Sequence, residues 1–289
     1  MIRKIITEAL QEVGDFTNIK KVEPVHGGEI NQSYYVETDE QQYFLKYNPD
    51  APKDFFRLEV EGLRLIKSTN TVNVPHVITY LDQPGKSILM TEWIEGRSNT
   101  DTEYLLGEQL AKLHQTYAKQ HGFKEKTYIG TLPQKNDFYD EWVDYYRDKR
   151  LIQQYRLGVE RGLISGERQK GLQQLMDQLH KWIPTGIKPS YLHGDFWGGN
   201  WLTGPKGEPY VIDPSFLYGD RHFELAFTEL FGGFSKSFYR GYNSILPEDG
   251  YYPQVKKLYQ LYYLLVHLNI FGEMYGSSVD SVIKEYRVR

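Results

Sequence analysis

Apolar residues repeat with two different periods along this chain of 289 residues, and the change between the periods lies about one third of the way along. The first third shows the alternation typical of strands, together with two amphipathic helical stripes, whereas longer helical stripes dominate beyond Gly96. The predicted strands are 33–38, 42–47, 77–81, 87–92, 191–193 and 210–213, and the predicted helices are 2–13, 56–66, 106–113, 142–151, 172–182 and 255–271. We therefore expect an α+β chain of two lobes, 1–94 and 95–289, packed together with a cleft between them.

Composition excludes several classes of function. The 34 Lys and Arg against 38 Asp and Glu give a net charge of -4, so a nucleic-acid partner is not expected. The chain has no cysteine, which excludes disulfides and thiol catalysis. No signal peptide is evident, and the longest apolar stretch, 261–271, is too short to span a bilayer. These features predict a cytoplasmic protein without a membrane partner, and a monomer is favoured.

The segment His193-Gly-Asp-Phe-Trp-Gly-Gly-Asn200, followed by Asp213 at the end of a predicted strand, contains the residues that phosphoryl transfer needs. Asp195 would accept the proton of an attacking hydroxyl, while Asn200 and Asp213 would hold Mg²⁺ on nucleotide phosphates. The spacing matches the kinase catalytic loop H-R-D-x-x-x-x-N, with Gly194 in place of Arg. The alternative is a glycine-rich turn in which the Asp and Asn side chains cap local backbone groups.

Two charged residues upstream complete this pattern. Lys46 lies in a predicted strand, where it would contact nucleotide phosphates, and Glu59 lies on the next helix, where it would pair with the lysine. Each residue alone would be an ordinary solvated side chain. Their order and their position before the catalytic segment favour the functional interpretation.

Two further segments would bind the nucleotide, expected to be ATP. The loop around Gly28 could cover the phosphates with its backbone N–H groups and with the side chains of Asn31 and Ser33. A simple hairpin turn explains this loop equally well. The segment Glu92, Trp93 and Ile94, which leaves the last strand of the first lobe, would present backbone groups to adenine.

At this point the chain resembles the fructosamine kinase (ketosamine-3-kinase) family, a branch of the aminoglycoside phosphotransferase-like proteins. The catalytic segment is similar to the family's H-G-D-L-W-x-G-N loop, and Gly27-Gly-Glu-Ile-Asn-Gln-Ser-Tyr34 is similar to its G-G-x-I-N-x-S-Y loop. Gly130-Thr-Leu-Pro-Gln-Lys-Asn136 and His267-Leu-Asn-Ile-Phe-Gly272 follow further family patterns. The matching segments extend over nearly the whole chain.

The resemblance implies a two-lobed protein kinase-like fold, with a small antiparallel N-terminal sheet, a mainly helical C-terminal lobe and the active site in the cleft. It implies ATP-dependent phosphorylation of the 3-hydroxyl of a small-molecule ketosamine, such as a ribulosamine or fructosamine, in the removal of glycation. Trp197 would face this acceptor, and His267 would help to shape its pocket. The chain departs from the family pattern at His222 and Glu224, where Glu and Asp are usual, and this departure weakens the expectation about acceptor choice.

Three alternatives remain open from the sequence. A related phosphotransferase acting on an aminoglycoside or choline would share every core residue. A non-catalytic nucleotide-binding module would be expected to lack one of Lys46, Asp195, Asn200 and Asp213, all of which are present. A metal-dependent hydrolase built from His193, Asp195, Asp213 and His222 would leave the first lobe unexplained.

Overall fold

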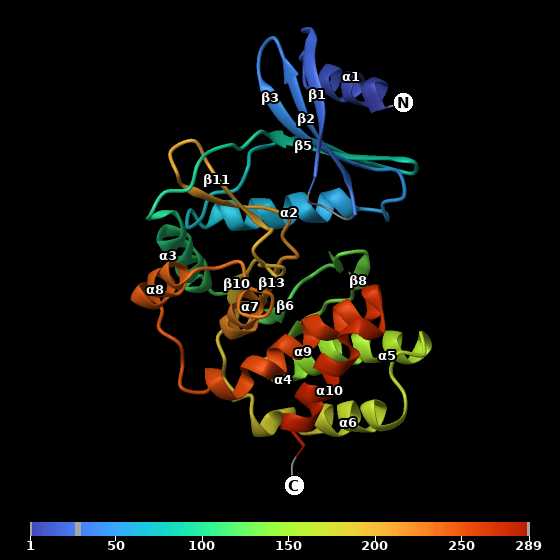
Figure 1. Cartoon of the computed structure of the whole chain (residues 1–289), viewed down its shortest axis with the longest axis vertical. Helices are drawn as coiled ribbons and strands as arrows, with labels where there is room; N and C mark the ends of the chain where they lie inside the picture. The colour runs from blue at the N-terminus through green and yellow to red at the C-terminus, as the bar shows by residue number, and fades with distance from the viewer. Residues whose placement is uncertain (1, 27–29, 288–289) are drawn as a thin grey trace.

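The computed structural model describes residues 2–26 and 30–287, and its N-terminal part is a five-stranded antiparallel sheet (Figure 1). The strand order is β1-β2-β3-β5-β4. The strands are β1 (Ile19–Val25), β2 (Gln32–Thr38), β3 (Gln42–Asn48), β4 (Val77–Gln83) and β5 (Lys86–Glu92). The predicted hairpin of β2 and β3 is confirmed, with Tyr35 opposite Phe44.

Strand β1 was not predicted from the sequence. Its residues, Ile-Lys-Lys-Val-Glu-Pro-Val, lack regular alternation, and none of them is fully buried. The strand lies at the edge of the sheet, where a proline and charged side chains are tolerated. Its place is determined by backbone pairing to β2, which leaves little trace in an apolar pattern.

Two helices pack on this sheet. Helix α1 (Ile2–Glu12) buries Ile6 and Leu10 against the β3 side chains that point to its face, which include Leu45. Helix α2 (Phe55–Ser68) lies on the side of the sheet that faces the rest of the molecule (Figure 1). Both helices agree with the predicted stripes, because each buries one apolar face and exposes the other.

The C-terminal part is mainly helical, as predicted (Figure 1). Its helices are α3 (Thr102–His114), α4 (Trp142–Tyr145), α5 (Ile152–Glu160), α6 (Gly166–Asp177), α7 (Arg221–Thr228), α8 (Lys236–Ile245), α9 (Tyr252–Phe271) and α10 (Gly276–Glu285). A π-helical turn, Tyr146–Leu151, joins α4 to α5. Helix α9 is buried on nearly every side, as the apolar run at 255–271 predicted. Within the described residues, no helix is both long enough and apolar enough to span a bilayer.

Three of these helices, α7, α8 and α10, were missed by the sequence analysis, and the predicted helix 142–151 ended before α5 begins. Helix α7 has only eight residues, and its polar side chains, Arg221, His222, Glu224 and Thr228, are buried together with its apolar ones, so its short sequence does not indicate a buried helix. Helix α10 begins with Gly-Ser-Ser and contains two valines, residues with weak helix propensity. Their helical state comes from packing: Val279 and Ile283 of α10 belong to the main core.

Short strands connect the loops of the C-terminal part. Strands β10 (Ser190–Leu192) and β13 (Leu217–Gly219) pair with each other, and β6 (His121–Gly122) and β9 (Phe138–Tyr139) extend this sheet. The other strands form two separate hairpins. These are β7 (Thr127–Ile129) with β8 (Leu132–Gln134), and β11 (Trp201–Thr203) with β12 (Pro209–Val211).

The two parts share one core through helix α2. Leu63 and Ile66 of this helix belong to the same cluster of buried residues as the C-terminal helices. Gly62 rests directly on Pro214, since a Cβ atom at this position would lie 3.0 Å from the proline ring. The predicted boundary between residues 94 and 95 falls in the irregular segment between β5 and α3, and as a domain boundary it stays a prediction.

Candidate active site

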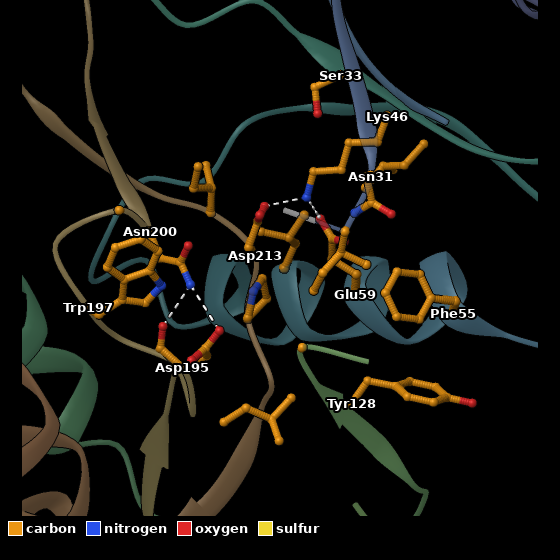
Figure 2. Close-up of a pocket in the computed structure, with 18 of the residues that line it drawn as sticks. Asn31, Ser33, Lys46, Phe55, Glu59, Tyr128, Asp195, Trp197, Asn200 and Asp213 are labelled. Atoms are coloured by element: carbon orange, nitrogen blue, oxygen red, sulfur yellow. Dashed lines mark hydrogen bonds and ion pairs between the residues drawn. The ribbon is translucent and has the colours of Figure 1, made fainter. Parts of the chain in front are cut away.

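A cavity of about 790 Å³ lies between the two parts and brings the described candidate residues together (Figure 2). The predicted residues that line it are Asn31, Ser33, Lys46, Glu59, Glu92, Trp93, Ile94, Asp195, Trp197, Asn200, Asp213 and His267. Gly28 lies outside the described residues. Residues from both predicted lobes therefore meet at a single site.

Strand register explains why Lys46 reaches this cavity. In the antiparallel sheet Lys46 lies opposite Ser33 on β2 and opposite Leu89 on β5. Side chains at opposed positions project from the same face, and all three line the cavity. Leu45, one residue earlier, points to the other face and packs under α1. Alternation along β3 thus places the lysine in the cleft.

The ammonium of Lys46 is shared between two carboxylates. Its Nζ lies 2.8 Å from Glu59 Oε1 and forms a second, close ion pair with Asp213 (Figure 2). Burial disfavours the charged ammonium, but Asp213 and Glu59 outweigh burial and raise the pKa of Lys46. Burial, together with the negative charge of Asp213, raises the pKa of Glu59. The lysine therefore stays charged. Its two ion pairs connect the sheet to α2 and to the segment after β12.

The start of α2 is fixed by a residue from another strand. The carboxylate of Asp82 in β4 accepts hydrogen bonds from the backbone N–H groups of Phe56, at 3.2 Å, and Arg57, at 2.8 Å. A carboxylate at this end satisfies unpaired N–H groups and favours the positive end of the helix dipole. Glu59 follows within the next turn, so this contact helps to set its position.

Asp195 lies on the loop after β10, which the structure links to the segment that carries Asp213. His193 Nε2 lies 2.7 Å from the carbonyl oxygen of Ile212, and the Ile212 N–H donates to the carbonyl of Asn200 at 3.0 Å. Through these bonds His193 and Asn200 hold the loop against the segment that carries Asp213. Asp213 itself has a left-handed backbone, with φ 59°, a strained conformation often found at functional sites.

Gly194 replaces the arginine of the kinase motif for a steric reason. Its φ is 86°, and a Cβ atom would lie 1.9 Å from the carbonyl oxygen of Ser215. A side chain cannot be placed there without moving the backbone. The loop therefore depends on glycine immediately before Asp195.

Asp195 has the electrostatic character of a proton acceptor. Burial raises the pKa of Asp195 well above its usual value, and the negative charge of Asp213 raises it further. Part of the side chain still faces the cavity. A carboxylate whose pKa is raised has a greater affinity for the proton of a bound hydroxyl.

Asn200 is oriented by Asp195. Its Nδ2 donates to the backbone carbonyl of Asp195 at 2.8 Å and to Asp195 Oδ2 at 3.2 Å (Figure 2). Both amide hydrogens are thereby used, which leaves Oδ1 as an acceptor beside the cavity. Asn200 Oδ1 and the Asp213 carboxylate are oxygen ligands of the kind that Mg²⁺ prefers, and this ion needs only one or two protein ligands beside phosphates and water. The residues present therefore fit Mg²⁺.

The hydrolase alternative requires a convergent set of metal ligands. Over the described residues, no group of three or more His, Asp or Glu side chains could hold a metal ion. His222 of the proposed set is not a cavity-lining residue. The geometry does not support this alternative.

Glu224, which sequence reasoning noted only as a departure from the family pattern, holds the catalytic loop from behind. Its Oε1 accepts from the His193 N–H at 3.0 Å and its Oε2 from the Gly194 N–H at 2.5 Å, while His114 Nε2 lies 2.9 Å from Oε1. Burial opposes ionisation, but the hydrogen bond and charge of His114, together with His193 and the Gly194 N–H, outweigh burial and lower the pKa of Glu224. No signal local to the sequence marks this role, because the partners lie 30 residues or more away.

Glu224→Gln is expected to destabilise the protein by about 1–3 kcal/mol, because the new amide NH₂ group must face a backbone N–H donor. The loop that carries Asp195 loses one of its supports, so kcat should fall while the KM values for both substrates change little. Thermal unfolding and steady-state kinetics measure the two effects, with the exposed Glu167→Gln as a control. Unchanged stability and unchanged kcat would contradict this role.

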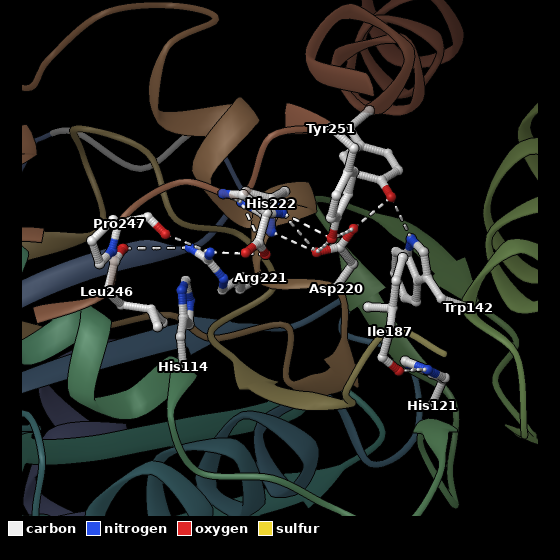
Figure 3. Close-up of polar contacts among 12 residues, drawn as sticks. His114, His121, Trp142, Ile187, Asp220, Arg221, His222, Leu246, Pro247 and Tyr251 are labelled. Carbon is white, nitrogen blue, oxygen red and sulfur yellow. Dashed lines mark hydrogen bonds and ion pairs between the residues drawn. The ribbon is translucent and has the colours of Figure 1, made fainter. Parts of the chain in front are cut away.

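The second departure, His222, belongs to a buried polar network away from the cavity (Figure 3). Its Nδ1 lies 3.0 Å from the hydroxyl of Tyr251, and its backbone N–H donates to Asp220 at 2.9 Å. Tyr259 also donates to Asp220, at 2.6 Å. Neither His222 nor Glu224 lines the cavity, so the expectation that this region bears directly on acceptor choice is corrected: Glu224 supports the catalytic loop, and His222 contacts Asp249 and Tyr251, just before α9.

Two backbone N–H groups of the predicted adenine-binding segment already donate hydrogen bonds within the protein. The N–H of Glu92 donates to the carbonyl of His76 at 3.0 Å, and that of Trp93 to the carbonyl of Gln42 at 3.4 Å. No acceptor for the Ile94 N–H is found among the described residues. Phe44, Leu89 and the segment itself make this end of the cavity apolar, as a flat base requires.

Trp197 also lines the cavity and lies beside Asn200 in Figure 2. Its side chain is 40% exposed, whereas the preceding Phe196 is fully buried. Its indole ring lies over Gly199, where a Cβ atom would come within 2.3 Å of the ring. An exposed aromatic ring next to Asp195 offers a stacking surface to an acceptor.

Comparison with known proteins gives one family for the whole chain. The model of the fructosamine kinase family matches residues 1–288. A protein of Enterococcus faecium named as a probable ketoamine kinase is 38% identical over 267 residues, which are 92% of this chain and 95% of that protein. A protein of Arabidopsis thaliana named protein-ribulosamine 3-kinase, chloroplastic, is 32% identical over 284 residues, with 97% and 87% coverage.

Solved structures agree with this result. One from Haemophilus somnus, named "Putative fructosamine-3-kinase", superposes with a TM-score of 0.85 at 30% identity and covers 99% of this chain and 97% of that one. An aminoglycoside phosphotransferase in ternary complex with AMP-PNP and hygromycin B gives a TM-score of 0.66 at 15% identity, with 100% and 99% coverage. The second likeness concerns the fold alone. The predicted two-lobed protein kinase-like fold is confirmed.

Proposed function

The chain belongs to the fructosamine kinase family, and we propose that it transfers the γ-phosphoryl group of ATP to the 3-hydroxyl of a ketosamine, the adduct of a sugar and an amine. The names of its relatives support this acceptor class, since they include ketoamine kinase and protein-ribulosamine 3-kinase. In this family role the phosphorylated adduct breaks down and frees the amine, so the reaction removes glycation.

One observation carries the proposal. A single cavity contains a buried lysine paired with two carboxylates at the nucleotide side, and a carboxylate with a raised pKa beside an exposed tryptophan at the acceptor side. Phosphoryl transfer is catalysed mainly by positioning and charge stabilisation, and it needs both of these parts in one space.

The residues divide the reaction between them. Asp195 accepts the proton of the acceptor hydroxyl as its oxygen bonds to the γ-phosphorus and the bond from that phosphorus to the bridging oxygen of ADP breaks. Lys46, positioned by Glu59, binds the nucleotide phosphates, and Asn31 and Ser33 approach them from the first lobe. Mg²⁺, held by Asn200 and Asp213, would neutralise charge on the phosphates. The backbone of Glu92, Trp93 and Ile94 would present hydrogen-bonding groups to adenine, and the segment around Gly28 would cover the phosphates with its backbone N–H groups.

A turnover assay with Mg-ATP tests the proposed function. The acceptors are ribulosamine and fructosamine derivatives, with an aminoglycoside and choline as controls, and mass spectrometry detects one added phosphate. Phosphorylation of the ketosamines alone is the expected result. Turnover of a control alone would favour the related phosphotransferases, and ATP binding without turnover of any acceptor would favour the non-catalytic module.

Trp197→Ala is expected to raise the KM for the ketosamine by about 10- to 100-fold, because the variant loses the stacking surface for the sugar. The KM for ATP should stay close to that of the parent enzyme. Steady-state kinetics with each substrate varied in turn measures both constants. Trp197→Phe, which keeps an aromatic face, should recover most of the affinity. Equal changes in both KM values would exclude an acceptor role for this residue.

A further inference from the structure

The cavity that Trp197 lines is also lined by an aromatic chamber, which consists of Phe231, His267, Ile270, Phe271 and Tyr275. Three separate segments form it: the loop after α7, the last turn of α9, and the short helical turn Glu273–Tyr275. The ring of His267 lies at its centre, 4.6 Å from the ring of Phe231, 5.0 Å from Tyr275 and 5.6 Å from Phe271.

The chamber presents apolar surface that the fold does not bury. Phe231 is 44% exposed and Phe271 is 45% exposed, although Phe223 in the neighbouring α7 is completely buried. Exposed aromatic side chains that gather in a concave site indicate a binding surface for an apolar group.

Charged side chains are confined to the rest of the cavity. Among the described residues that line it, the acidic and basic side chains, histidine apart, are Lys46, Glu59, Glu92, Asp195 and Asp213. All of them lie on the nucleotide side or on the catalytic machinery, and none belongs to the chamber. A carboxylate carried into the chamber would find no lysine or arginine there, and His267 Nδ1 already lies 2.8 Å from the carbonyl oxygen of Tyr263, so exchanging hydration for mainly apolar contacts would cost free energy.

The chamber is fixed relative to Asp195 by a close backbone contact. Gly198 of the catalytic loop and Gly233, two residues after Phe231, approach so closely that a Cβ atom at either position would lie 2.9 Å from the other's Cα. Phe196 and Phe234 add a ring contact at 5.3 Å next to it. The loop that carries Phe231 is thus packed directly on the loop that carries the proposed base.

We propose that the aromatic chamber binds the substituent of the amine, and that it selects ketosamines whose amine carries an apolar group, aromatic above all, against ketosamines of free amino acids. This inference rests on the proposed function. In a ketosamine the amine is attached at C1, two carbons from the C3 that carries the reacting hydroxyl. A substrate whose hydroxyl is at Asp195 and whose sugar contacts Trp197 extends its substituent into the next part of the cavity, which is the chamber.

Three ribulosamines test the inference, made from benzylamine, methylamine and glycine. The benzylamine adduct is expected to have a kcat/KM at least about 10-fold above that of the methylamine adduct, because burial of the phenyl ring is favourable. The glycine adduct should fall below the methylamine adduct, because its carboxylate enters a mainly aromatic space that has no lysine or arginine.

Two variants assign the preference to the chamber. Phe231→Ala and Phe271→Ala should each reduce the ratio of benzylamine to methylamine kcat/KM by about 5- to 10-fold. Met274→Ala is the control, because Met274 lies in the same helical turn as Tyr275 but is 75% exposed and does not line the cavity. Equal kcat/KM for the three adducts in the parent enzyme, or an unchanged ratio in both variants, would overturn the inference while the proposed function stands. Absence of turnover with all three adducts would overturn both.

Discussion

Asp195→Asn is expected to lower kcat by about 10²- to 10⁴-fold, the range that a positioned general base contributes. The amide cannot accept the proton of the acceptor hydroxyl, yet it nearly preserves the shape of the side chain. The Asn200 contact to the Asp195 backbone carbonyl, at 2.8 Å, does not depend on the carboxylate and should persist. Binding of ATP, measured by calorimetry, should therefore change little while turnover is almost lost.

The same variant should be more stable than the parent protein at neutral pH. Burial raises the pKa of Asp195 in the folded state above its usual value of 3.8, so the folded protein holds this proton more tightly than the unfolded chain does. Stability then falls as pH rises from 3.8 through the raised pKa, and the full penalty is present above it. The gain in melting temperature from Asp195→Asn should accordingly be largest at neutral pH and shrink as the pH approaches 3.8.

The pH dependence of turnover gives an independent check. Because Asp195 must be ionised to accept a proton, kcat/KM should fall on the acid side through a pKa above 3.8, and the residual activity of the variant should lack this limb. Asp177→Asn, at the exposed end of α6, is the matched control. Full activity of Asp195→Asn would contradict the assignment of Asp195 as the base. So would a fall in the parent enzyme's kcat/KM at acid pH through the ordinary aspartate pKa.

Lys46→Met is expected to abolish most activity and to destabilise the protein by about 3–5 kcal/mol. The substitution keeps the apolar stem but removes the one cation that Glu59 and Asp213 share. The side chain of Glu59 is only 13% exposed, so its charge would remain in the cleft without its partner. Chemical denaturation measures the loss of stability, and calorimetry with ATP measures the loss of phosphate binding.

A double variant separates stability from function. Lys46→Met with Glu59→Gln removes the ammonium and one carboxylate together, so it should recover a substantial part of the lost stability but none of the activity. Lys86→Met is the matched control: Lys86 also lies in the sheet and pairs with Glu8, but both side chains are substantially exposed, and such pairs contribute about 0–1 kcal/mol. Equal destabilisation by Lys46→Met and Lys86→Met would contradict the proposed role of the shared lysine.

Much of the candidate site was predictable because its parts depend on short stretches of sequence. Asp195 and Asn200 belong to one loop, and their contact is a bond across five residues. Lys46 could be assigned to the cleft because alternation along β3 separates it from Leu45, which faces the core. Strand alternation and loop spacing are local properties, so they can be read without the structure.

Other parts could not be predicted because their partners are distant in the chain. Glu224 lies 30 residues after Gly194 of the catalytic loop, on the short helix α7, whose polar side chains are buried together with its apolar ones. The aromatic chamber combines a loop residue, Phe231, with the end of α9, and no local pattern relates them. Strand β1 is identified by its pairing with β2 and not by its own side chains.

The sequence by itself determined the two-lobed α+β organisation and the family, and it supplied the candidates for the reacting groups, since motif spacing and apolar periodicity carry this information locally. Only the tertiary structure decided how these groups act on each other. The ion pair of Lys46 with Asp213 spans 167 residues, and it forms because Gly62 allows α2 to rest on Pro214, next to that aspartate. Such contacts arise from the packing of whole elements against one another, and packing depends on the shapes of surfaces that distant segments create together.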